Sequence, residues 1–330
     1  MTIRPFHLPH DLDTMNALVM QGFEYPENPE WSIRADEKES MLDRVQGAKR
    51  MWPLLRFLRF FSPIFKDIMR GFIAEKDGKP VGLINFMRQR DEPEWNIANV
   101  TVLPSHRRRG LARQLVAAVL DDLRARKART AILDVVDKNL PALRLYQEMG
   151  FEIFTGSLEA DLEAGAAIPD PTLPAGWTLA PRSRFDWQSG FELAKRITPK
   201  NVARYEPPVE ARFRFPPIRP LIGSLFMKLG GDDSKRYVLR APDGTIAGIA
   251  WYSCRTKQGG MNSAGFDLDP AHPELAQFML AHAISTIQAA SPGRRIEFNF
   301  SDWQPALFQA AEAFGVKKRF GSHRMGLKFQ

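Results

Sequence analysis

Residues 100–116 read VTVLPSHRRRGLARQLV, an apolar stretch followed by four basic residues, a glycine and a helical pattern. The apolar stretch predicts a strand over 96–103 that ends at Pro104. Apolar side chains then recur with helical spacing over 111–126, which predicts a helix that begins near Gly110. Main-chain N–H groups in the first turn of a helix lack internal partners and lie at the positive end of the helix dipole. The turn between strand and helix is therefore a candidate anion site.

Side chains at this turn add to the case for an anion. Gly110 has no Cβ, so a phosphate can approach the main chain there, and Ala112 is the next smallest choice. The sequence holds no Gly-x-Gly-x-x-Gly and no Gly-Lys-Ser/Thr pattern, which excludes Rossmann and Walker loops on spacing. A basic, solvated helix start remains the alternative interpretation of the turn. Four arginines supply charge that complements phosphate: Arg107, Arg108, Arg109 and Arg113.

Two halves of the chain follow the same plan. Residues 72–87 and 237–253 each predict a strand, an Asp-Gly turn and a second strand, and the two turns lie 166 residues apart. VLPSH at Val102 is echoed by LDPAH at Leu268, again 166 residues later. PALRLYQEMGF over 141–151 is echoed by PALFQAAEAFGV over 305–316. We infer that one domain is present in two copies.

A segment rich in alanine, glycine and proline, residues 163–177, separates the copies and predicts a linker. The expected organisation is a first domain over 1–165, a linker over 166–176 and a second domain over 177–330. In each copy strands alternate with helical patterns, so the predicted class is α/β or α+β with a mixed sheet. In the first copy we expect a buried strand over 130–136.

Composition limits the class of protein. The 330 residues carry a formal charge of +8, and 44% of them are hydrophobic, as in an ordinary globular protein. No apolar run is long enough to span a membrane, so no transmembrane helix is expected. The first residues, MTIRPFHLPHDLD, have no apolar core, so no secretion signal is expected. The single cysteine, Cys254, excludes an intramolecular disulfide and suits a reducing compartment, so we expect a cytoplasmic protein. We find no zinc-finger spacing, no homeodomain-like helix and no aromatic RNA-stacking signature, and we expect neither a metal nor a nucleic-acid partner.

The segment Arg50–Phe72 has no counterpart in the second copy, and it is apolar, aromatic and cationic. Three interpretations remain open for it. The segment could form a lid over a substrate cleft, a membrane-surface helix, or an ordinary buried helix pair broken at Pro63.

Two motifs in the first copy resemble the GNAT acetyltransferase superfamily. RRRGLA, Arg107–Ala112, fits that family's Arg/Gln-x-x-Gly-x-Gly/Ala pyrophosphate loop, and it follows a strand as the family's fourth strand does. About thirty residues later, NLPALRLYQEMGFE resembles the family's Asn-x-x-Ala-x-x-x-Tyr-x-x-x-Gly-Phe segment. The resemblance covers Met1 to about Leu162, and it implies two tandem GNAT-like acyltransferase domains.

The resemblance further implies acetyl-CoA as cosubstrate and an amine of a small molecule or peptide as acceptor. The fourth and fifth strands are then expected to splay apart around the pantetheine. Asn139 is expected to contact the cosubstrate, and Tyr146 to protonate the leaving thiolate. The remaining residues implied to hold acetyl-CoA are Val102, Leu103, Arg107, Arg108, Arg109, Gly110, Leu111, Ala112 and Arg113.

The general base is harder to place, because the fourth strand WNIANV contains no carboxylate. Glu94, just before it, is the nearest candidate, and Asp134 on the following strand is another. Direct attack by a neutral amine is expected, with the N–H near Val102 polarising the acetyl carbonyl. Because Cys254 lies outside both motifs, a thiol nucleophile is not expected.

The second copy has lost the loop, since PAHPELAQFM over 270–279 contains no glycine before its helix. Glu274 repels phosphates there, and Tyr146 is replaced by Ala310 or Ala311. We expect an active first copy and a degenerate second one, in a monomer or homodimer. Asp267 and Asp269 are candidate contacts for a cationic acceptor, or plain surface carboxylates. Two other functions stay open: a non-catalytic acyl-CoA-binding or regulatory protein, and a basic membrane-surface or nucleic-acid binder.

Overall fold

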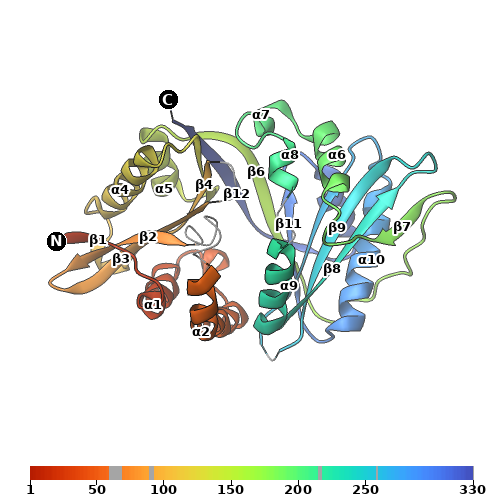
Figure 1. The fold of residues 1–330 in the computed structure, drawn as a ribbon. Helices are drawn as coiled ribbons and strands as arrows, with labels where there is room; N and C mark the ends of the chain where they lie inside the picture. The colour runs from red at the N-terminus through yellow and green to blue at the C-terminus, as the bar shows by residue number, and fades with distance from the viewer. Residues whose placement is uncertain (59–68, 89–92, 215–217, 258, 330) are drawn as a thin grey trace. The chain divides into compact units, whose positions relative to one another are not determined.

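The computed structural model describes residues 1–58, 69–88, 93–214, 218–257 and 259–329, and the chain forms two compact units (Figure 1). The first unit comprises Met1–Phe154 together with His323–Gln330, and the second comprises Thr155–Ser322. Of the predicted segment Arg50–Phe72, residues 59–68 lie outside the described residues. Every helix in the described part of the chain is too short or too polar to cross a membrane.

The first unit is a mixed sheet with strand order β1-β2-β3-β4-β5, continued by the C-terminal part of β12. Strands β4 and β5 are parallel, and the pairs from β1 to β4 are antiparallel. Its elements are β1 (Thr2–Pro5), α1 (Leu12–Gly22), η1 (Pro29–Trp31), α2 (Ala35–Leu58), β2 (Arg70–Lys76), β3 (Lys79–Arg88), β4 (Glu94–Val102), η2 (Pro104–His106), α4 (Leu111–Ala125), β5 (Thr130–Val136) and α5 (Leu140–Glu148).

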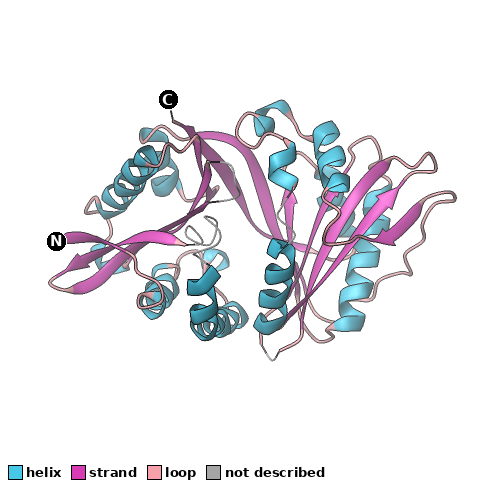
Figure 2. Cartoon of the chain, viewed as in Figure 1, coloured by secondary structure: helices cyan, strands magenta, loops and turns pink. Residues whose placement is uncertain are grey.

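The second unit repeats this plan with strand order β6-β11-β10-β9-β8-β7, in which β10 and β11 are parallel. Figure 2 shows helices on both faces of the strands in each unit. The elements of the remaining chain are β6 (Glu152–Leu162), β7 (Thr178–Pro181), α6 (Gln188–Ile197), α7 (Lys200–Ala203), α8 (Glu210–Phe213), α9 (Ile218–Gly230), β8 (Asp232–Arg240), β9 (Ile246–Arg255), β10 (Asn262–Leu268), α10 (Leu275–Ala290), β11 (Ile296–Ser301), α11 (Pro305–Ala313) and β12 (Lys317–Lys328).

Side-chain alternation along the strands explains the layers of the first unit. Successive residues of a strand point to opposite faces, so Ala74 and Ile84 pack with α4 and α5, whereas Ile73 and Leu83 pack with α1 and α2. Burying this apolar surface on both faces is the main stabilising contribution to the unit. The predicted apolar stripe of α4 is confirmed, because all six of its residues are buried: Leu111, Leu115, Val116, Val119, Leu120 and Leu123.

Both predicted hairpins are present. In the first, Asp77 and Gly78 have φ of 52° and 73°, the left-handed pair that suits a two-residue turn between twisted strands. In the second, Gly244 has φ of 85° within a longer turn that joins β8 to β9.

Strand register confirms the repeat. Gly82 of β3 pairs with Val102 of β4, and Gly248 of β9 pairs with Leu268 of β10. Each residue of the second pair lies 166 positions after its counterpart in the first pair, which is the offset between the matching stretches of the sequence. The two units therefore share one topology from their hairpin to their parallel strand pair.

The boundary between the two compact units does not lie at the linker that the sequence predicts. Residues 155–162, which precede the linker, belong to the second unit, where β6 pairs with β11 from Leu162–Ile296 to Ser157–Ser301. Residues 323–330 belong to the first unit, and there Phe329 N–H donates to Arg129 C=O at 3.0 Å. The expected limits at 165 and 177 follow the order of the sequence, whereas each unit takes up a strand from the other half of the chain.

Candidate acetyl-CoA and acceptor site

The parallel strands β4 and β5 separate part-way along their length. Their pairing runs from Glu94–Thr130 to Ile97–Leu133 and then stops. Strand β4 nevertheless continues to Val102, and β5 continues to Val136. The expected splay between the two strands is therefore present, and the facing main-chain groups beyond Ile97 do not pair with each other.

A bulge in β4 accompanies this separation. The register against β3 shifts between Leu83–Thr101 and Asn85–Ala98, so two residues of β4 lie opposite one residue of β3. Asn99 in the bulge has φ of 52°, and its Nδ2 donates to Asn85 Oδ1 at 3.2 Å. A bulge bends its strand locally, which turns this part of β4 out of line with β5.

The main chain of Val102 faces the gap between the strands. Leu103 N–H donates to Val81 C=O at 2.9 Å, on the β3 side of the strand. Because main-chain groups alternate in direction along a strand, the N–H and C=O of Val102 face the opposite edge, where β5 lies. The N–H is thus placed to donate to a ligand in the gap.

The loop after β4 carries a row of free donors. In the described chain, the main-chain N–H groups from Arg108 to Arg113 donate no hydrogen bond, and the first helical bond is Gln114 N–H to Gly110 C=O at 3.1 Å. Helix α4 begins behind them, so these N–H groups lie at the positive end of its dipole. Such a row fits a diphosphate, which offers several acceptor oxygens.

Backbone conformation explains the glycine in this loop. Gly110 caps α4 with φ of 74°, and Arg108 has φ of 62°, so two left-handed residues turn the chain here. A Cβ built on Gly110 meets nothing within 4 Å, because it projects into open space on the side of the loop. Left-handed residues of this kind build main-chain concavities that bind anions. Glycine therefore both permits the turn and leaves its outer side open.

The arginines of the loop have different surroundings. Arg108 and Arg109 are exposed, and Arg113 forms an ion pair with Glu148 of α5. Arg107 turns inward instead: its Nε donates to Val102 C=O at 3.2 Å and its guanidinium donates to Gly22 C=O at 2.8 Å. Its side chain therefore ties the end of β4 to the end of α1.

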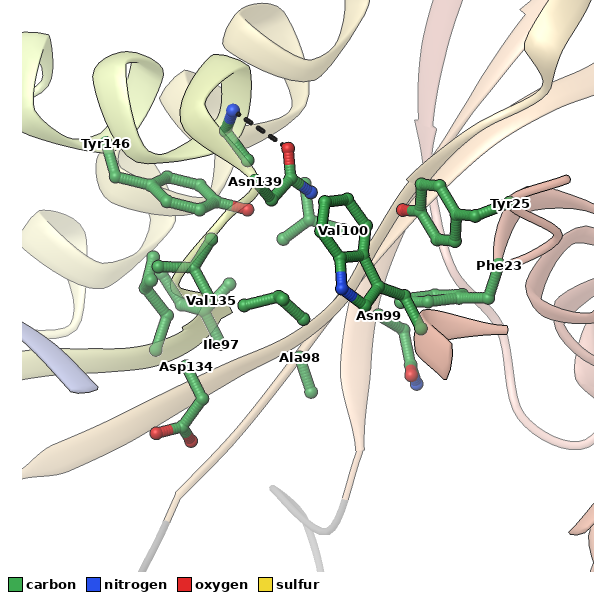
Figure 3. Close-up of a pocket in the computed structure, with 14 residues that line it drawn as sticks. Phe23, Tyr25, Ile97, Ala98, Asn99, Val100, Asp134, Val135, Asn139 and Tyr146 are labelled. Carbon is green, nitrogen blue, oxygen red and sulfur yellow. Dashed lines mark hydrogen bonds between the residues drawn. The ribbon is translucent and has the colours of Figure 1, made fainter. Parts of the chain in front are cut away.

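A cavity of about 130 Å³ lies where β4 and β5 separate (Figure 3). Asn139 and Tyr146 of α5 face it, so the structure brings these two predicted residues together. Asn139 caps α5, its Oδ1 accepting from Ala142 N–H at 3.3 Å, which leaves its Nδ2 for a ligand. Fourteen residues line the cavity: Phe23, Tyr25, Trp31, Ile97, Ala98, Asn99, Val100, Leu133, Asp134, Val135, Val136, Asn139, Ala142 and Tyr146.

Tyr146 is 5% exposed, and its hydroxyl makes no hydrogen bond within the described residues. Its ring packs edge-on against Phe151 at a centroid distance of 6.1 Å. Burial raises the pKa of Tyr146 above the ordinary tyrosine value, and the nearby Tyr25 raises it further. The hydroxyl therefore stays protonated and can donate.

The two candidate bases lie in different places. Glu94 is at the first position of β4 and 1% exposed, does not line the cavity, and accepts from the Arg129 guanidinium at 3.0 Å. Asp134 does line the cavity, although Figure 3 shows its carboxyl group pointing away from the Tyr146 ring. Its two oxygens accept from Arg324 at 2.8 and 3.0 Å. Among the described residues, no group of His, Cys, Asp or Glu is arranged to hold a metal ion.

The corresponding loop of the second unit has no free row of donors. Helix α10 begins after Glu274, which has ordinary right-handed φ and ψ of −61° and −24°. Leu275 N–H donates to His272 C=O at 3.2 Å, and Ala276 N–H donates to Pro273 C=O at 3.1 Å. Two N–H groups at the start of α10 are thus used within the loop itself, and the continuous row of free donors seen in the first unit is interrupted.

One wall of the cavity was not predicted from the sequence. Phe23, Tyr25 and Trp31 follow α1 in the stretch GFEYPENPEW, and all three line the cavity. The available signal was three aromatic residues among prolines and acidic residues, a composition typical of a loop, where aromatic side chains have no strand or helix face to fill.

Comparisons with known proteins agree with these features. Residues 32–151 match the model of the Acetyltransferase (GNAT) family. A mycothiol acetyltransferase of Thermomonospora curvata is 38% identical over 80 residues, 24% of this chain and 27% of that protein. The human N-acetyltransferase 8 is 34% identical over 85 residues, 24% and 37% of the two chains.

An aminoglycoside N(6')-acetyltransferase type 1 of Salmonella typhimurium is 31% identical over 93 residues, 26% of this chain and 64% of that protein. The matches therefore cover less than two thirds of each of these relatives, and about a quarter of the present chain.

Solved structures resemble the whole chain. A tandem GNAT protein from the clavulanic acid biosynthesis pathway has a TM-score of 0.65 at 16% identity, covering 99% of this chain and 98% of that one. A GCN5-related N-acetyltransferase from Sphaerobacter thermophilus has a TM-score of 0.63 at 14% identity, covering 99% and 95%. At such identities the likeness concerns the fold. The chain therefore carries a GNAT acetyltransferase domain in its first half and has the fold of tandem GNAT proteins.

Proposed function

We propose that the protein is an N-acetyltransferase that moves the acetyl group of acetyl-CoA to an amine of a small molecule or peptide. The observation that carries the proposal is a combination within one unit. A row of free N–H groups begins α4, β4 and β5 separate beside it, and the gap opens into a cavity that holds the buried Tyr146. The second unit, which lacks the free row, is proposed not to bind acetyl-CoA.

Particular residues are proposed to hold the cosubstrate. The main chain of Arg108 to Arg113 donates to the diphosphate, and the exposed Arg108 and Arg109 add charge to it. The N–H of Val102 and the Nδ2 of Asn139 donate to groups in the gap between the strands. Arg107 is the exception in this loop, because its N–H donates to Pro104 C=O at 3.2 Å and its guanidinium is bound to Val102 and Gly22. Leu103, Leu111 and Ala112 complete the loop.

When bound, acetyl-CoA supplies an activated acetyl carbonyl. The protein then assists the reaction by transferring protons. The acceptor nitrogen bonds to the acetyl carbon while the carbon–sulfur bond breaks, its electron pair leaving on sulfur. Tyr146 donates its proton to that sulfur, and the amine loses one proton to water at the cavity opening. Tyr146 recovers a proton from solvent, so the products are an amide and a free thiol.

The base is proposed to be water, with Asp134 as the nearest carboxylate that lines the cavity. Glu94 suits the role less well, since it pairs with Arg129 at the far end of β4 from Val102. The Asp134 carboxyl in turn is held by two hydrogen bonds from Arg324, at 2.8 and 3.0 Å.

Titration calorimetry with acetyl-CoA followed by a thiol-release assay tests the proposal. We expect one acetyl-CoA per chain and release of free thiol only when an amine is supplied. A thiol reagent suits the assay, because Cys254 is buried and is the single cysteine of the chain. Binding without release for every amine supports a non-catalytic acyl-CoA-binding protein. Absence of binding at millimolar acetyl-CoA contradicts the proposal altogether.

A further inference from the structure

The wall of the cavity that faces Tyr146 is aromatic. Phe23, Tyr25 and Trp31, named here the aromatic wall, come from the segment that follows α1 and ends with η1. Figure 3 shows Phe23 and Tyr25 on the opposite side of the cavity from Tyr146. All three side chains are half-buried, so part of each remains open to a ligand.

Contacts within the segment that carries the aromatic wall hold it in one conformation. Tyr25 and Trp31 meet edge to face at a centroid distance of 5.7 Å. Ser32 Oγ accepts from Tyr25 N–H at 2.8 Å, which closes the segment on itself. A wall that is already ordered loses little conformational entropy when a ligand binds.

Contacts with β4 and its loop fix the wall relative to the acetyl site. A Cβ on Gly22 would lie 1.7 Å from Thr101 Oγ1, so the end of α1 packs directly on β4. The Arg107 guanidinium donates to Gly22 C=O and lies 5.2 Å from the centre of the Tyr25 ring. The wall therefore keeps its place opposite Tyr146.

The cavity offers no uncompensated negative charge among its lining residues. Its ionisable members are Tyr25, Asp134 and Tyr146. Asp134 is neutralised by Arg324, and burial keeps both tyrosines in their neutral form by raising the pKa of each. An acceptor with several ammonium groups would have to give up water around each charge and would find no partner carboxylate.

We propose that the acceptor carries a single amine on an aromatic or apolar body that packs against the aromatic wall, and that polycationic acceptors are poor substrates. This inference rests on the proposed acetyltransferase function. Ring–ring contacts of the kind that Phe23, Tyr25 and Trp31 offer favour a flat body at centroid distances of about 4.5–7 Å. They hold the body on one side while its amine reaches the acetyl carbon beside Tyr146.

The test compares three acceptors in the thiol-release assay on the full chain: 2-phenylethylamine, spermidine and an aminoglycoside. We expect kcat/KM for 2-phenylethylamine to exceed both polycations by at least twentyfold. Trp31→Ala should raise the KM for 2-phenylethylamine at least tenfold and leave the KM for acetyl-CoA within twofold. The matched control is Trp251→Ala in the second unit, a 45% exposed tryptophan, which should change neither constant.

Two results overturn the inference while the proposed function stands: faster acetylation of spermidine or the aminoglycoside, or an unchanged KM in Trp31→Ala. If no amine releases thiol, the proposed function fails, and calorimetry of 2-phenylethylamine with the CoA-bound protein decides the inference. There Trp31→Ala should weaken binding at least tenfold. Equal binding by the two proteins, or none by the unsubstituted chain, overturns the aromatic acceptor.

Discussion

The two units start the helix after their fourth strand in opposite ways. In the first, eight residues from Leu103 to Gly110 connect β4 to α4, and the donors at the helix start stay free. In the second, six residues from Asp269 to Glu274 connect β10 to α10, and the donors bond within the loop. The strands before these loops share one register, so this difference in free donors arises in the loop itself. An anion site in this fold therefore depends on loop length and on a left-handed glycine.

The space between the two parallel strands also differs between the units: it is open in the first and filled in the second. Asn139 and Gln304 occupy corresponding positions, each at the N-cap position of the helix after the fifth strand of its unit, but only the Asn139 side chain makes a capping hydrogen bond. Gln304 is buried, and its Nε2 donates to Leu268 C=O at 3.0 Å, the position that corresponds to Val102. Phe266 stacks on Phe300 at 6.4 Å beside it. The second unit thus fills with its own side chains a space that the first unit leaves open.

Replacement of the loop glycine is expected to have the largest effect. Gly110→Glu places a carboxylate on the open side of the donor row, where it repels a diphosphate and strains a residue with φ of 74°. Calorimetry should show acetyl-CoA affinity reduced at least 100-fold. The substitution gives the first unit the charge that Glu274 gives the second.

Gly78→Glu is the matched control for that variant. Gly78 has φ of 73° and open space around it, so the strain is equal, but it lies in the β2–β3 turn. Both variants should lose about 1 kcal/mol of stability. Only Gly110→Glu should lose affinity for acetyl-CoA. If both variants lost affinity equally, backbone strain would explain the effect and the proposed role of Gly110 would be contradicted.

Tyr146→Phe is expected to act on turnover. Removing the hydroxyl leaves the ring in its contact with Phe151 but deprives the leaving sulfur of its proton donor, so kcat should fall about 100-fold. Acetyl-CoA affinity should stay within twofold. Tyr237→Phe, on β8 of the second unit, is the control and should leave kcat nearly unchanged. An unaltered rate in Tyr146→Phe removes this residue as the acid.

The smallest effect is expected at Asp267, which corresponds to Thr101 in strand register. Burial raises the pKa of Asp267 to about 6, above its usual 3.8, although the attraction of Arg182 opposes the shift. Because the folded state holds this proton more tightly than the unfolded state, stability is lost as the pH rises from about 4 to 6.

Asp267→Asn should therefore be more stable than the unsubstituted protein at pH 7.5, by about 1–3 kcal/mol, and equally stable below pH 4. Denaturant unfolding at the two pH values measures both. Asp170→Asn, at an exposed position of the linker, removes the same charge without burial and should show no such difference. Lower stability of Asp267→Asn at pH 7.5 would contradict the conclusion that the ionised Asp267 carboxylate costs stability in the folded state.

Local patterns in the sequence predicted much of this architecture. The strand over 130–136 and the start of α4 at Leu111 follow from apolar spacing, and the structure has both at those residues. The Asp-Gly hairpins and the 166-residue repeat follow from turn chemistry and from matching stretches. Such features depend on neighbours a few residues apart, which a sequence displays directly.

Features that depend on contacts between distant parts of the chain could not be predicted from such local patterns. The exchange of residues 155–162 and 323–330 depends on which strand edges meet in space, and neither segment differs in composition from an ordinary strand. The inward course of Arg107 depends on Gly22, 85 residues earlier, so the sequence showed only its charge. Glu94 was a natural candidate by its place beside the strand, but the pairing partner Arg129 became visible only in three dimensions.

The most direct test of the account is a crystal structure of the protein with coenzyme A at saturating concentration. The account predicts the diphosphate within hydrogen-bonding distance of the main-chain N–H groups of Arg108 to Arg113, and no such density at the start of α10. A diphosphate bound elsewhere in the first unit, or at Glu274, would contradict the central claim that this loop is the acetyl-CoA site.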